Sequence, residues 1–415
     1  MRKEQLKTPC FVVREEGLRR NLEILKEVRM ETGCKILLAQ KAFSMYRVYP
    51  LIGQYLDGTT ASGLYEAKLG YEEMGKEHHI FSPAYKKEEM PEILRLCGHI
   101  VFNSPAQVKK YKEQVKQAGR SMGLRVNPEC STQEGHAIYD PCAPFSRLGT
   151  TLEKFEEEMS AEDISALDGL HFHTLCEQDS DDLAKTLQAV EEKFGKYLHR
   201  MKWVNFGGGH HITRPGYDIG LLKRCIRHMK ETYGVEVYLE PGEAVALNAG
   251  ELITEVMEIV ENGMKIAILD ASAACHMPDV LEMPYRPPLK DAGDPAEENA
   301  GGNGFAGSSP LGSSSMGSSS MGSGAADSGT AGHERPYEYR LAGPTCLAGD
   351  VIGDYSFAQP LKCGDRLEFQ DMAIYTMVKT NTFNGMRLPD IVLEREDGTC
   401  EIVKTFGYED FKARL

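Results

Sequence analysis

The sequence predicts an α/β protein in which a (β/α)8 barrel is followed by an antiparallel β domain, and three observations support this prediction. Eight short apolar or β-branched runs alternate with amphipathic helical patterns over about 210 residues, which is the number of βα units that such a barrel needs. After about residue 245 the runs follow one another across short turns, as antiparallel strands do. The length of 415 residues exceeds one ordinary core and fits two domains.

The first region of the chain supplies the barrel, which we place at residues 31–245. Each of its eight apolar runs ends in small or polar residues. Ser104 and Pro105 predict the start of a helix, with a capping side chain followed by proline at the first helical position. The expected barrel strands are Lys35–Gln40, Tyr55–Thr60, His79–Ser82, His99–Asn103, Gly123–Asn127, Leu167–Phe172, Lys202–Phe206 and Glu236–Glu240.

The β domain is expected at residues 246–415, and residues 1–30 predict one strand and one helix, the strand being a candidate to join that domain. Between Asp291 and His333 the chain is rich in Gly, Ser and Ala, and such a segment buries too little apolar surface to offset its backbone entropy. We therefore expect a disordered insertion without a catalytic role. The expected strands of the domain are Glu251–Val260, Met264–Ala273, Asp365–Val378, Asp390–Glu396 and Glu401–Tyr408.

Composition narrows the class of protein. A formal net charge of −15 disfavours nucleic acid as a partner, because phosphates would be repelled. The 11 cysteines include no CxxC pair, which indicates reduced thiols. Neither a signal peptide nor an apolar run long enough to span a membrane is evident, so we expect a soluble, cytoplasmic protein with no membrane partner.

The chemistry is expected where the barrel strands end, because catalytic groups of such barrels cluster at the carboxyl ends of the strands. Lys41 follows the first strand, where desolvation would lower its pKa and favour Schiff-base chemistry; the alternative is a lysine that reaches the rim. Gly207, Gly208 and Gly209 follow the seventh strand and give an anion access to backbone N–H groups. Glu240 and Gly242 follow the eighth strand, and these two loops form the usual phosphate site of the fold.

The sixth predicted strand ends in His171 and His173, whose side chains point the same way in an extended segment. The pair could ligate a metal with His210 or Cys176, or one imidazole could stack on an aromatic ring. Two half-buried, hydrogen-bonded histidines are the third reading, and spacing leaves all three open.

Two motifs in the β domain also carry chemistry. Cys346 lies in the turn Gly343–Asp350, which is rich in Gly and Pro and could expose the thiol at an edge. The strand-like run 370–376 contains Tyr375, whose hydroxyl could donate to a phosphate or lie at an interface.

With these motifs in this order, the chain resembles the fold-type III pyridoxal-5′-phosphate (PLP) decarboxylases, which share the alanine racemase-like fold and include ornithine, diaminopimelate and arginine decarboxylases. The resemblance spans nearly all of the chain outside the Gly/Ser-rich insertion. Within the family, segments such as LLAQKAFS, GLHFHTLCE, NFGGGHHITRPGYD and GPTCLAGDVIGDY look most like the carboxynorspermidine/carboxyspermidine decarboxylase branch. The resemblance implies PLP as the cofactor and decarboxylation of a polyamine amino acid to norspermidine or spermidine.

The resemblance also implies a role for each matching residue. Cofactor binding would fall to Lys41 (covalently), Arg125, His173 (stacking on the ring), Gly207, Gly208, Gly209 and Gly242 (around the phosphate), Tyr375 (donating to it) and Glu240 (on the ring nitrogen). Cys346 would approach from the partner subunit of a head-to-tail homodimer and reprotonate the α-carbon, with Lys41 as the other candidate donor. Asp350 would meet a substrate amine. Glu282 is a further candidate for an amine from its place in the segment MPDVLEMPYRP, where Arg286 could instead hold a carboxylate. No metal is implied.

Two positions depart from the family pattern. Cys176 stands where a phosphate-binding serine is common, and Glu243 follows the Glu-Pro-Gly motif where ornithine decarboxylases have an arginine, so another phosphate donor must substitute. The alternatives are a diaminopimelate, arginine or lysine decarboxylase, a non-catalytic regulatory homologue, and a metal hydrolase. Carboxyspermidine and carboxynorspermidine differ by one methylene, worth about 1–3 kcal/mol, so the sequence does not choose between them.

Overall fold

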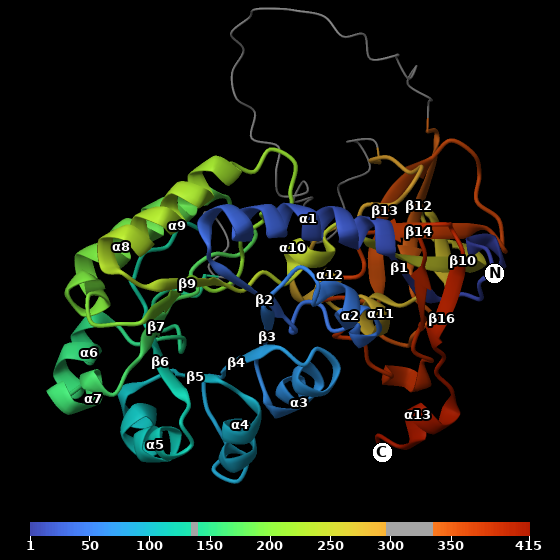
Figure 1. Ribbon diagram of the computed structural model, residues 1–415. Coiled ribbons are helices and arrows are strands. Elements are labelled where there is room, and N and C mark those ends of the chain that lie inside the picture. The colour runs from blue at the N-terminus through green and yellow to red at the C-terminus, as the bar shows by residue number, and fades with distance from the viewer. Residues whose placement is uncertain (134–139, 296–334) are drawn as a thin grey trace, which may run out of the picture. The chain divides into compact units, whose positions relative to one another are not determined.

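The computed structural model describes residues 1–133, 140–295 and 335–415 (Figure 1). The chain forms two compact units, one of residues Gly17–Leu247 and one of Met1–Glu16 together with Asn248–Leu415. Within the described residues, no helix combines the length and the apolar character needed to cross a membrane.

The first unit contains a closed barrel of eight parallel strands, which confirms the predicted barrel. Closure is made by β9 against β2, where Lys35 pairs with Tyr238 and Ile36 with Leu239. The strands are β2 (Lys35–Ala39), β3 (Gly58–Ala61), β4 (Glu77–Phe81), β5 (His99–Phe102), β6 (Ser121–Arg125), β7 (Gly169–His171), β8 (Trp203–Asn205) and β9 (Glu236–Leu239). Strand side chains fill the interior of the barrel and helices cover its outer face, so most strand residues are buried.

The helices between the strands begin and end where the local sequence directs. The Ser104 hydroxyl accepts a bond from the Gln107 amide at 3.4 Å, which confirms the predicted start of α5. Gly234 ends α9 with φ +69°, a conformation that glycine adopts at little cost. The helices are α1 (Glu15–Thr32), α2 (Tyr49–Ile52), α3 (Leu64–Glu73), α4 (Met90–Leu96), α5 (Pro105–Gln117), α6 (Leu152–Glu158), α7 (Ala161–Ser165), α8 (Ser180–Leu198), α9 (Ile219–Tyr233) and α10 (Glu243–Ala246).

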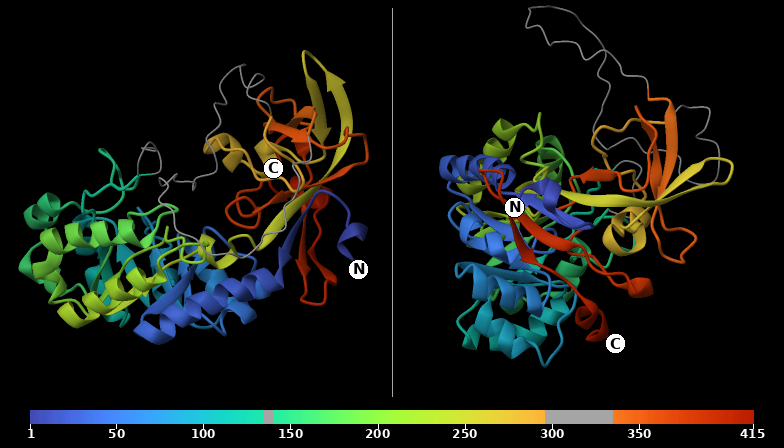
Figure 2. Two further views of the ribbon diagram at one scale, coloured as in Figure 1. Left: turned by 90° about the horizontal axis from the view of Figure 1, so that it is seen from above. Right: turned by 90° about the vertical axis from the view of Figure 1, so that its right-hand side faces the viewer.

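The second unit is an eight-stranded sheet in the order β13-β12-β11-β10-β1-β15-β16, with β14 also paired to β10. The long strand β10 returns as β11, and this ribbon is yellow in Figure 2. Pairing is mostly antiparallel, which confirms the predicted antiparallel β domain, and only β1 with β15 and β11 with β12 run parallel among the described strands. The strands are β1 (Cys10–Arg14), β10 (Gly250–Glu261), β11 (Lys265–Leu269), β12 (Tyr337–Ala342), β13 (Val351–Phe357), β14 (Arg366–Gln370), β15 (Asp390–Glu394) and β16 (Cys400–Lys404).

The second unit also contains three short helices, α11 (Ala273–His276), α12 (Asp279–Glu282) and α13 (Tyr408–Lys412).

Two strands and one strand end of this unit differ from the prediction. The sequence patterns missed β12 and β13; β13 carries Gly353 and Asp354, residue types that are depleted in strands. The expected strand Asp365–Val378 stops at Gln370, since Asp371 and Tyr375 have left-handed φ values of 59° and 49° and form a turn. The insertion expected at Asp291–His333 lies, from residue 296 on, outside the described residues.

Candidate active site

Lys41 lies two residues past the carboxyl end of β2. Lys41 is an exposed residue, and its ammonium lies near charged groups that follow other strands. Burial by these groups lowers the pKa of the Lys41 ammonium, and the Arg125 guanidinium adds repulsion that the carboxylates of Glu240 and Glu66 only partly offset. Lys41 is thus an exposed lysine with a lowered pKa at the carboxyl end of the barrel.

Glu240 directly follows β9 and is 6% exposed. Its Oε2 lies 3.3 Å from His171 Nε2 at the end of β7, and its Oε1 accepts a bond from Asn205 Nδ2 at 2.8 Å at the end of β8. Burial alone would raise the pKa of Glu240, but the bond from His171 and the Asn205 amide outweigh it and lower this pKa to about 2. Burial lowers the pKa of His171, so a neutral ring donates its Nε2 proton to a carboxylate that stays ionised.

His173 lies directly against the glycines that follow β8. The Gly208 amide donates to His173 Nδ1 at 3.1 Å, which puts the ring proton on Nε2. Burial, together with the Lys41 and Arg125 cations, holds the pKa of His173 well below its usual range. A Cβ at Gly207 would lie 2.6 Å from the His173 Cβ, in a residue whose φ is +69°. Only glycine therefore fits beside this histidine.

Gly209 and Gly242 lie equally close to backbone. A Cβ at Gly209 would stand 2.0 Å from the carbonyl oxygen of Leu175, and one at Gly242 would stand 2.8 Å from that of Ala39. The loops after β7, β8, β9 and β2 thus approach one another through glycine. The absence of side chains there leaves backbone N–H groups accessible to an anion such as a phosphate.

Arg125, the last residue of β6, is 5% exposed. Its Nη2 donates to the His173 carbonyl at 2.9 Å, and its guanidinium lies 4.7 Å from the centre of the Phe81 ring. Burial lowers the pKa of Arg125 to about 10, so it remains a cation at neutral pH. It therefore places a fixed positive charge at the same end of the barrel as Lys41.

The second unit holds the other predicted residues. Cys346 is exposed, and Asn384 contacts it twice, through a bond of 3.1 Å to the Cys346 amide and through Nδ2 at 3.7 Å from the sulfur. Asp350 is 3% exposed and accepts bonds from the Ser272 hydroxyl at 2.9 Å and the Thr345 hydroxyl at 2.7 Å. In this geometry Asp350 holds the turn that presents Cys346, and its predicted contact with a substrate amine stays a prediction.

Three more predicted residues lie in turns or short helices of the same unit. Tyr375 is partly buried in the turn that follows β14, not in a strand. Glu282 ends α12 and accepts a bond from Lys379 Nζ at 2.9 Å. Arg286 donates to the Asp354 carbonyl at 2.9 Å and lies over the Tyr355 ring.

Comparison with known proteins agrees with this arrangement. Residues 11–373 match the family model described as pyridoxal-dependent decarboxylase, C-terminal sheet domain. The chain belongs to the pyridoxal-dependent decarboxylases. The resemblance seen in the sequence motifs is confirmed.

Relatives within this decarboxylase family cover the whole chain. The carboxynorspermidine/carboxyspermidine decarboxylase of Campylobacter jejuni is 42% identical over 412 residues, 99% of each chain. The carboxyaminopropylagmatine decarboxylase of Synechocystis is 38% identical over 416 residues, covering all of this chain and 97% of the relative. A crystal structure of carboxynorspermidine decarboxylase from C. jejuni, complexed with norspermidine, matches with a TM-score of 0.83 at 41% identity, over 99% of this chain and 100% of that one.

The residues at the carboxyl end of the barrel fit the cofactor of the family. They supply a lysine whose amine is less basic than usual, loops that only glycine can form, and a carboxylate that stays ionised. An aldehyde, a phosphate and a protonated ring nitrogen are the three groups of PLP that these features match.

Cys176 and Glu243, the two residues that depart from the family pattern, lie near each other. Glu243 Oε1 lies 3.3 Å from His211 Nε2, and the pair lies next to Glu177. Although burial opposes it, the bond with Glu243 raises the pKa of His211. Burial raises the pKa of the Cys176 thiol to about 12, so it stays protonated. His211 can thus carry a positive charge beside the glycine loop, where the sequence requires a replacement donor for the phosphate.

Sequence reasoning missed Asn205, Phe81 and His211 as members of this site. Asn205 ends β8 as His171 ends β7, so the strand-end rule that found Lys41 would also have found Asn205. Phe81 stacks on His171 with ring centres 5.5 Å apart, which the spacing of the two histidines does not reveal. Among the described residues, the two groups with metal-ligand spacing include neither His171 nor His173.

Proposed function

We propose that this chain decarboxylates carboxynorspermidine and carboxyspermidine to norspermidine and spermidine, a step of polyamine biosynthesis. The observation that carries the proposal is the full-length similarity to the C. jejuni enzyme, whose crystal structure contains norspermidine. A polyamine with an α-amino acid at one end is a cationic substrate, and the net charge of −15 favours its approach.

The residues of the barrel divide the work of binding and activation. Lys41, with its lowered pKa, supplies an amine that can bind PLP covalently. When bound, PLP supplies the electron sink for the charge that the departing carboxyl group leaves behind. Glu240, held ionised by His171 and Asn205, favours a protonated ring nitrogen and so deepens that sink. His173 would lie against the ring, and Gly207, Gly208, Gly209 and Gly242 would surround the phosphate with Arg125 close by and Tyr375 donating to it.

Loss of carbon dioxide leaves an electron pair on the α-carbon, which must take up one proton. We propose Cys346 of the partner subunit as the donor, with Lys41 as the alternative. The exposure of Cys346 supports this role, because its thiol is free to face another chain. We propose that the enzyme is a head-to-tail homodimer in which each active site contains residues of both subunits. We also propose that it is cytoplasmic.

The distal amines of the substrate need acidic partners. Glu282 and Asp279 already contact one ammonium, that of Lys379, at 2.9 Å and 2.5 Å. This contact supports Glu282 as a site for a primary amine, provided that the substrate displaces Lys379. Arg286 contacts the carboxylate of Asp294, which supports its assignment to a carboxylate. Asp350 is the remaining candidate for an amine.

A second substrate is favoured by a specific observation. The 38% identity to the carboxyaminopropylagmatine decarboxylase is only slightly lower than the identity to the C. jejuni enzyme. That substrate would bring a guanidinium in place of a distal ammonium.

A panel of substrates distinguishes these activities. The purified enzyme is supplied with carboxynorspermidine, carboxyspermidine, carboxyaminopropylagmatine, diaminopimelate, arginine and lysine in turn, and carbon dioxide and the amine product are quantified. We expect the first two to have the highest kcat/KM, within about tenfold of each other. Preference for carboxyaminopropylagmatine, or for one of the three amino acids, would replace the proposed substrate and keep the reaction. No release of carbon dioxide from any of them would overturn the proposal.

A further inference from the structure

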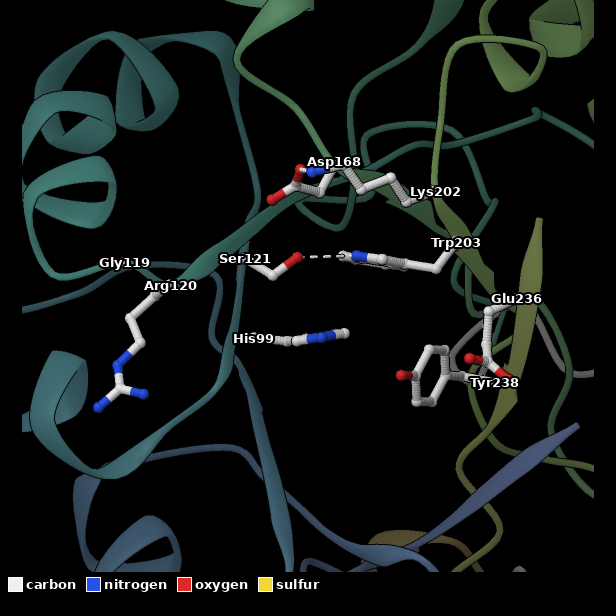
Figure 3. A pocket seen from close by; sticks show the side chains of 9 residues that line it. All are labelled: His99, Gly119, Arg120, Ser121, Asp168, Lys202, Trp203, Glu236 and Tyr238. Atoms are coloured by element: carbon white, nitrogen blue, oxygen red, sulfur yellow. Dashed lines mark hydrogen bonds and ion pairs between the residues drawn. The ribbon is translucent and has the colours of Figure 1, made fainter. Parts of the chain in front are cut away.

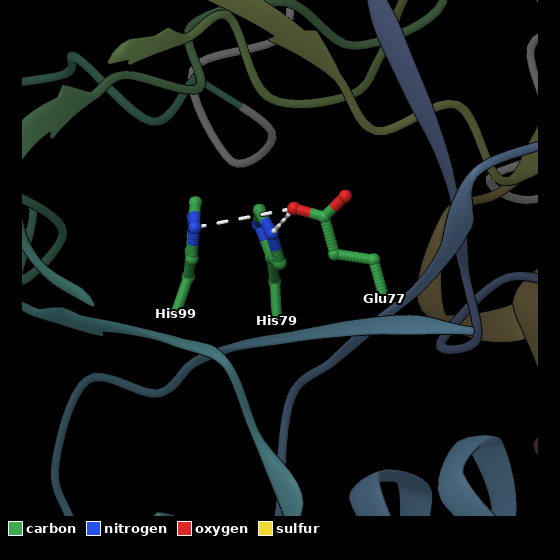
Figure 4. A group of neighbouring side chains, drawn as sticks. All are labelled: Glu77, His79 and His99. Carbon is green, nitrogen blue, oxygen red and sulfur yellow. Dashed lines mark hydrogen bonds and ion pairs between the residues drawn. The ribbon is translucent and has the colours of Figure 1, made fainter. Parts of the chain in front are cut away.

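A second cluster of carboxylate and imidazole groups lies at the amino-terminal end of the barrel, apart from the residues assigned above. Glu77 is the first residue of β4, His79 is the third, and His99 is the first residue of β5 (Figure 4). His79 and His99 are direct partners in the register of these parallel strands. Glu77 and His79 are two residues apart and therefore share one face of the strand.

The three side chains lie close together. Glu77 Oε1 lies 3.0 Å from His79 Nε2 and 3.9 Å from His99 Nε2, and one ligand atom from each residue fits within 4.8 Å of the other two. The two imidazoles are stacked with ring centres 3.9 Å apart. Neighbouring strands fix the backbone of all three residues, so the two rings need only turn out of their stack to share an ion.

The protein alone leaves these imidazoles incompletely bonded. Nδ1 of both His79 and His99 is buried and has no hydrogen-bond partner among the described residues, and His79 is only 1% exposed. Nε2 of each ring faces Glu77 Oε1, so Nε2 is the ligand atom of each histidine and Nδ1 carries the ring proton.

Neighbouring groups fix the carboxylate and open a route to it. Tyr238 donates to Glu77 Oε1 at 2.8 Å, and Lys35 Nζ lies 3.2 Å from Oε2, so Oε1 is the oxygen that faces the rings. His99, Trp203 and Tyr238 also line a pocket of about 420 Å³ at this end of the barrel (Figure 3). His99 is the member of the cluster that lines this pocket, so an ion would enter past His99.

We propose that Glu77, His79 and His99 bind a divalent transition-metal ion such as Zn²⁺ at the amino-terminal end of the barrel. Two imidazoles and one carboxylate, with water in the fourth position, are a common ligand set for Zn²⁺ and for Co²⁺. Because the active sites of such barrels lie at the opposite end, the ion would stabilise the fold by joining β4 to β5.

Titration of the holoenzyme with Co²⁺, followed by visible absorbance, tests the site. We expect one ion per chain with the d–d bands of nitrogen and oxygen ligands and no thiolate charge-transfer band, a distinction that matters because Cys346 and Cys363 are exposed. Zn²⁺ should raise the temperature of unfolding of the wild-type protein. His99→Gln should lose both effects, because this side chain is partly exposed and its replacement should leave the fold intact.

Two further variants make the result decisive. His228→Gln removes an exposed histidine that lies 2.8 Å from Glu191, and it should bind Co²⁺ as the wild type does. Lys35→Met removes the positive charge beside Glu77 and should tighten binding by about fivefold or more. A thiolate band, binding that survives His99→Gln, or an affinity that Lys35→Met leaves unchanged would each overturn the proposal.

Discussion

The two ends of the barrel contain the same pair of groups in different surroundings. At the carboxyl end Glu240 contacts His171 at 3.3 Å, and at the amino end Glu77 contacts His79 at 3.0 Å. Around Glu240 lie two cations, Lys41 and Arg125, and loops that only glycine can form.

Around Glu77 lie aromatic rings, with Trp203 stacked on His99 at 5.1 Å and Tyr238 bonded to the carboxylate. The difference teaches that a carboxylate–histidine pair does not define a function by itself. Charge, backbone space and the end of the barrel at which the pair lies decide what it can bind.

The largest expected effect is the difference between replacing Lys41, which follows β2, and replacing Lys35, which begins it. Lys41→Ala should abolish decarboxylation and the visible absorbance band of the bound cofactor, because no other amine takes its place. Lys35→Ala removes a lysine from the start of the same strand and should keep the band. Absorbance spectra and turnover of the two variants check this, and a band retained in Lys41→Ala would contradict the assignment.

The next effect compares the two glutamates. Glu240→Gln keeps the size of the side chain but removes its charge, and we expect kcat to fall by about 10²- to 10³-fold. Glu77→Gln should instead lower the free energy of unfolding, because buried His79 and Lys35 lose their partner. Steady-state kinetics and urea unfolding of both variants measure the contrast. Equal losses of kcat would show that the two ends are not functionally distinct.

A smaller effect tests the glycine loop. Gly207→Ala would place a Cβ 2.6 Å from the His173 Cβ, and we expect a destabilisation of about 1–3 kcal/mol with weaker cofactor binding. Gly216→Ala is the matched control, since Gly216 has a φ of +87° but nothing within 4 Å of the added Cβ. Cofactor affinity that falls equally in both variants would assign the effect to backbone strain and not to contact with His173.

The smallest effect is a dependence of stability on pH. Burial lowers the pKa of His78 and of His210 to about 4, whereas in the unfolded chain each titrates near 6.5. Between these values the unfolded state binds more protons, so stability falls as the pH drops from about 6.5 to 4. Urea midpoints measured across this range should decline, and His210→Gln should flatten the decline. A midpoint that rises on acidification would contradict the buried, neutral histidines.

Mixed dimers test whether each active site contains residues of both subunits. If sites are shared, combining Lys41→Ala with Cys346→Ala chains should restore about a quarter of the wild-type activity, because half of the random dimers regain one intact site. Activity that stays at the level of the separate variants would contradict a site built from two subunits.

Much of this structure follows from patterns that a sequence displays. Eight apolar runs predicted eight strands, and the rule that catalytic groups follow barrel strands selected Lys41, Glu240 and the glycines as candidates. What the sequence could not show was pairing across the barrel. Nothing in the spacing of Glu77, His79 and His99 indicates that β4 and β5 place them in contact, because that depends on strand register.

The β domain was harder to predict for a related reason. β13 contains Gly353 and Asp354, and it is stabilised by pairing with β12 rather than by its own strand propensity. Asp350 was expected to meet a substrate amine, and no sequence pattern indicated that Ser272, 78 residues away, contacts it in the folded chain. Such long-range hydrogen bonds leave no local signal in the sequence.

The most direct test of the central claim is to locate the cofactor on the chain. Reduction of the PLP-loaded enzyme with borohydride fixes the cofactor to its lysine, and peptide mapping by mass spectrometry identifies that residue. The account predicts a pyridoxyl label on Lys41 and none on Lys35 at the other end of the same strand. A label on another lysine, or no label at all, would contradict the assignment of the carboxyl end of the barrel as the active site.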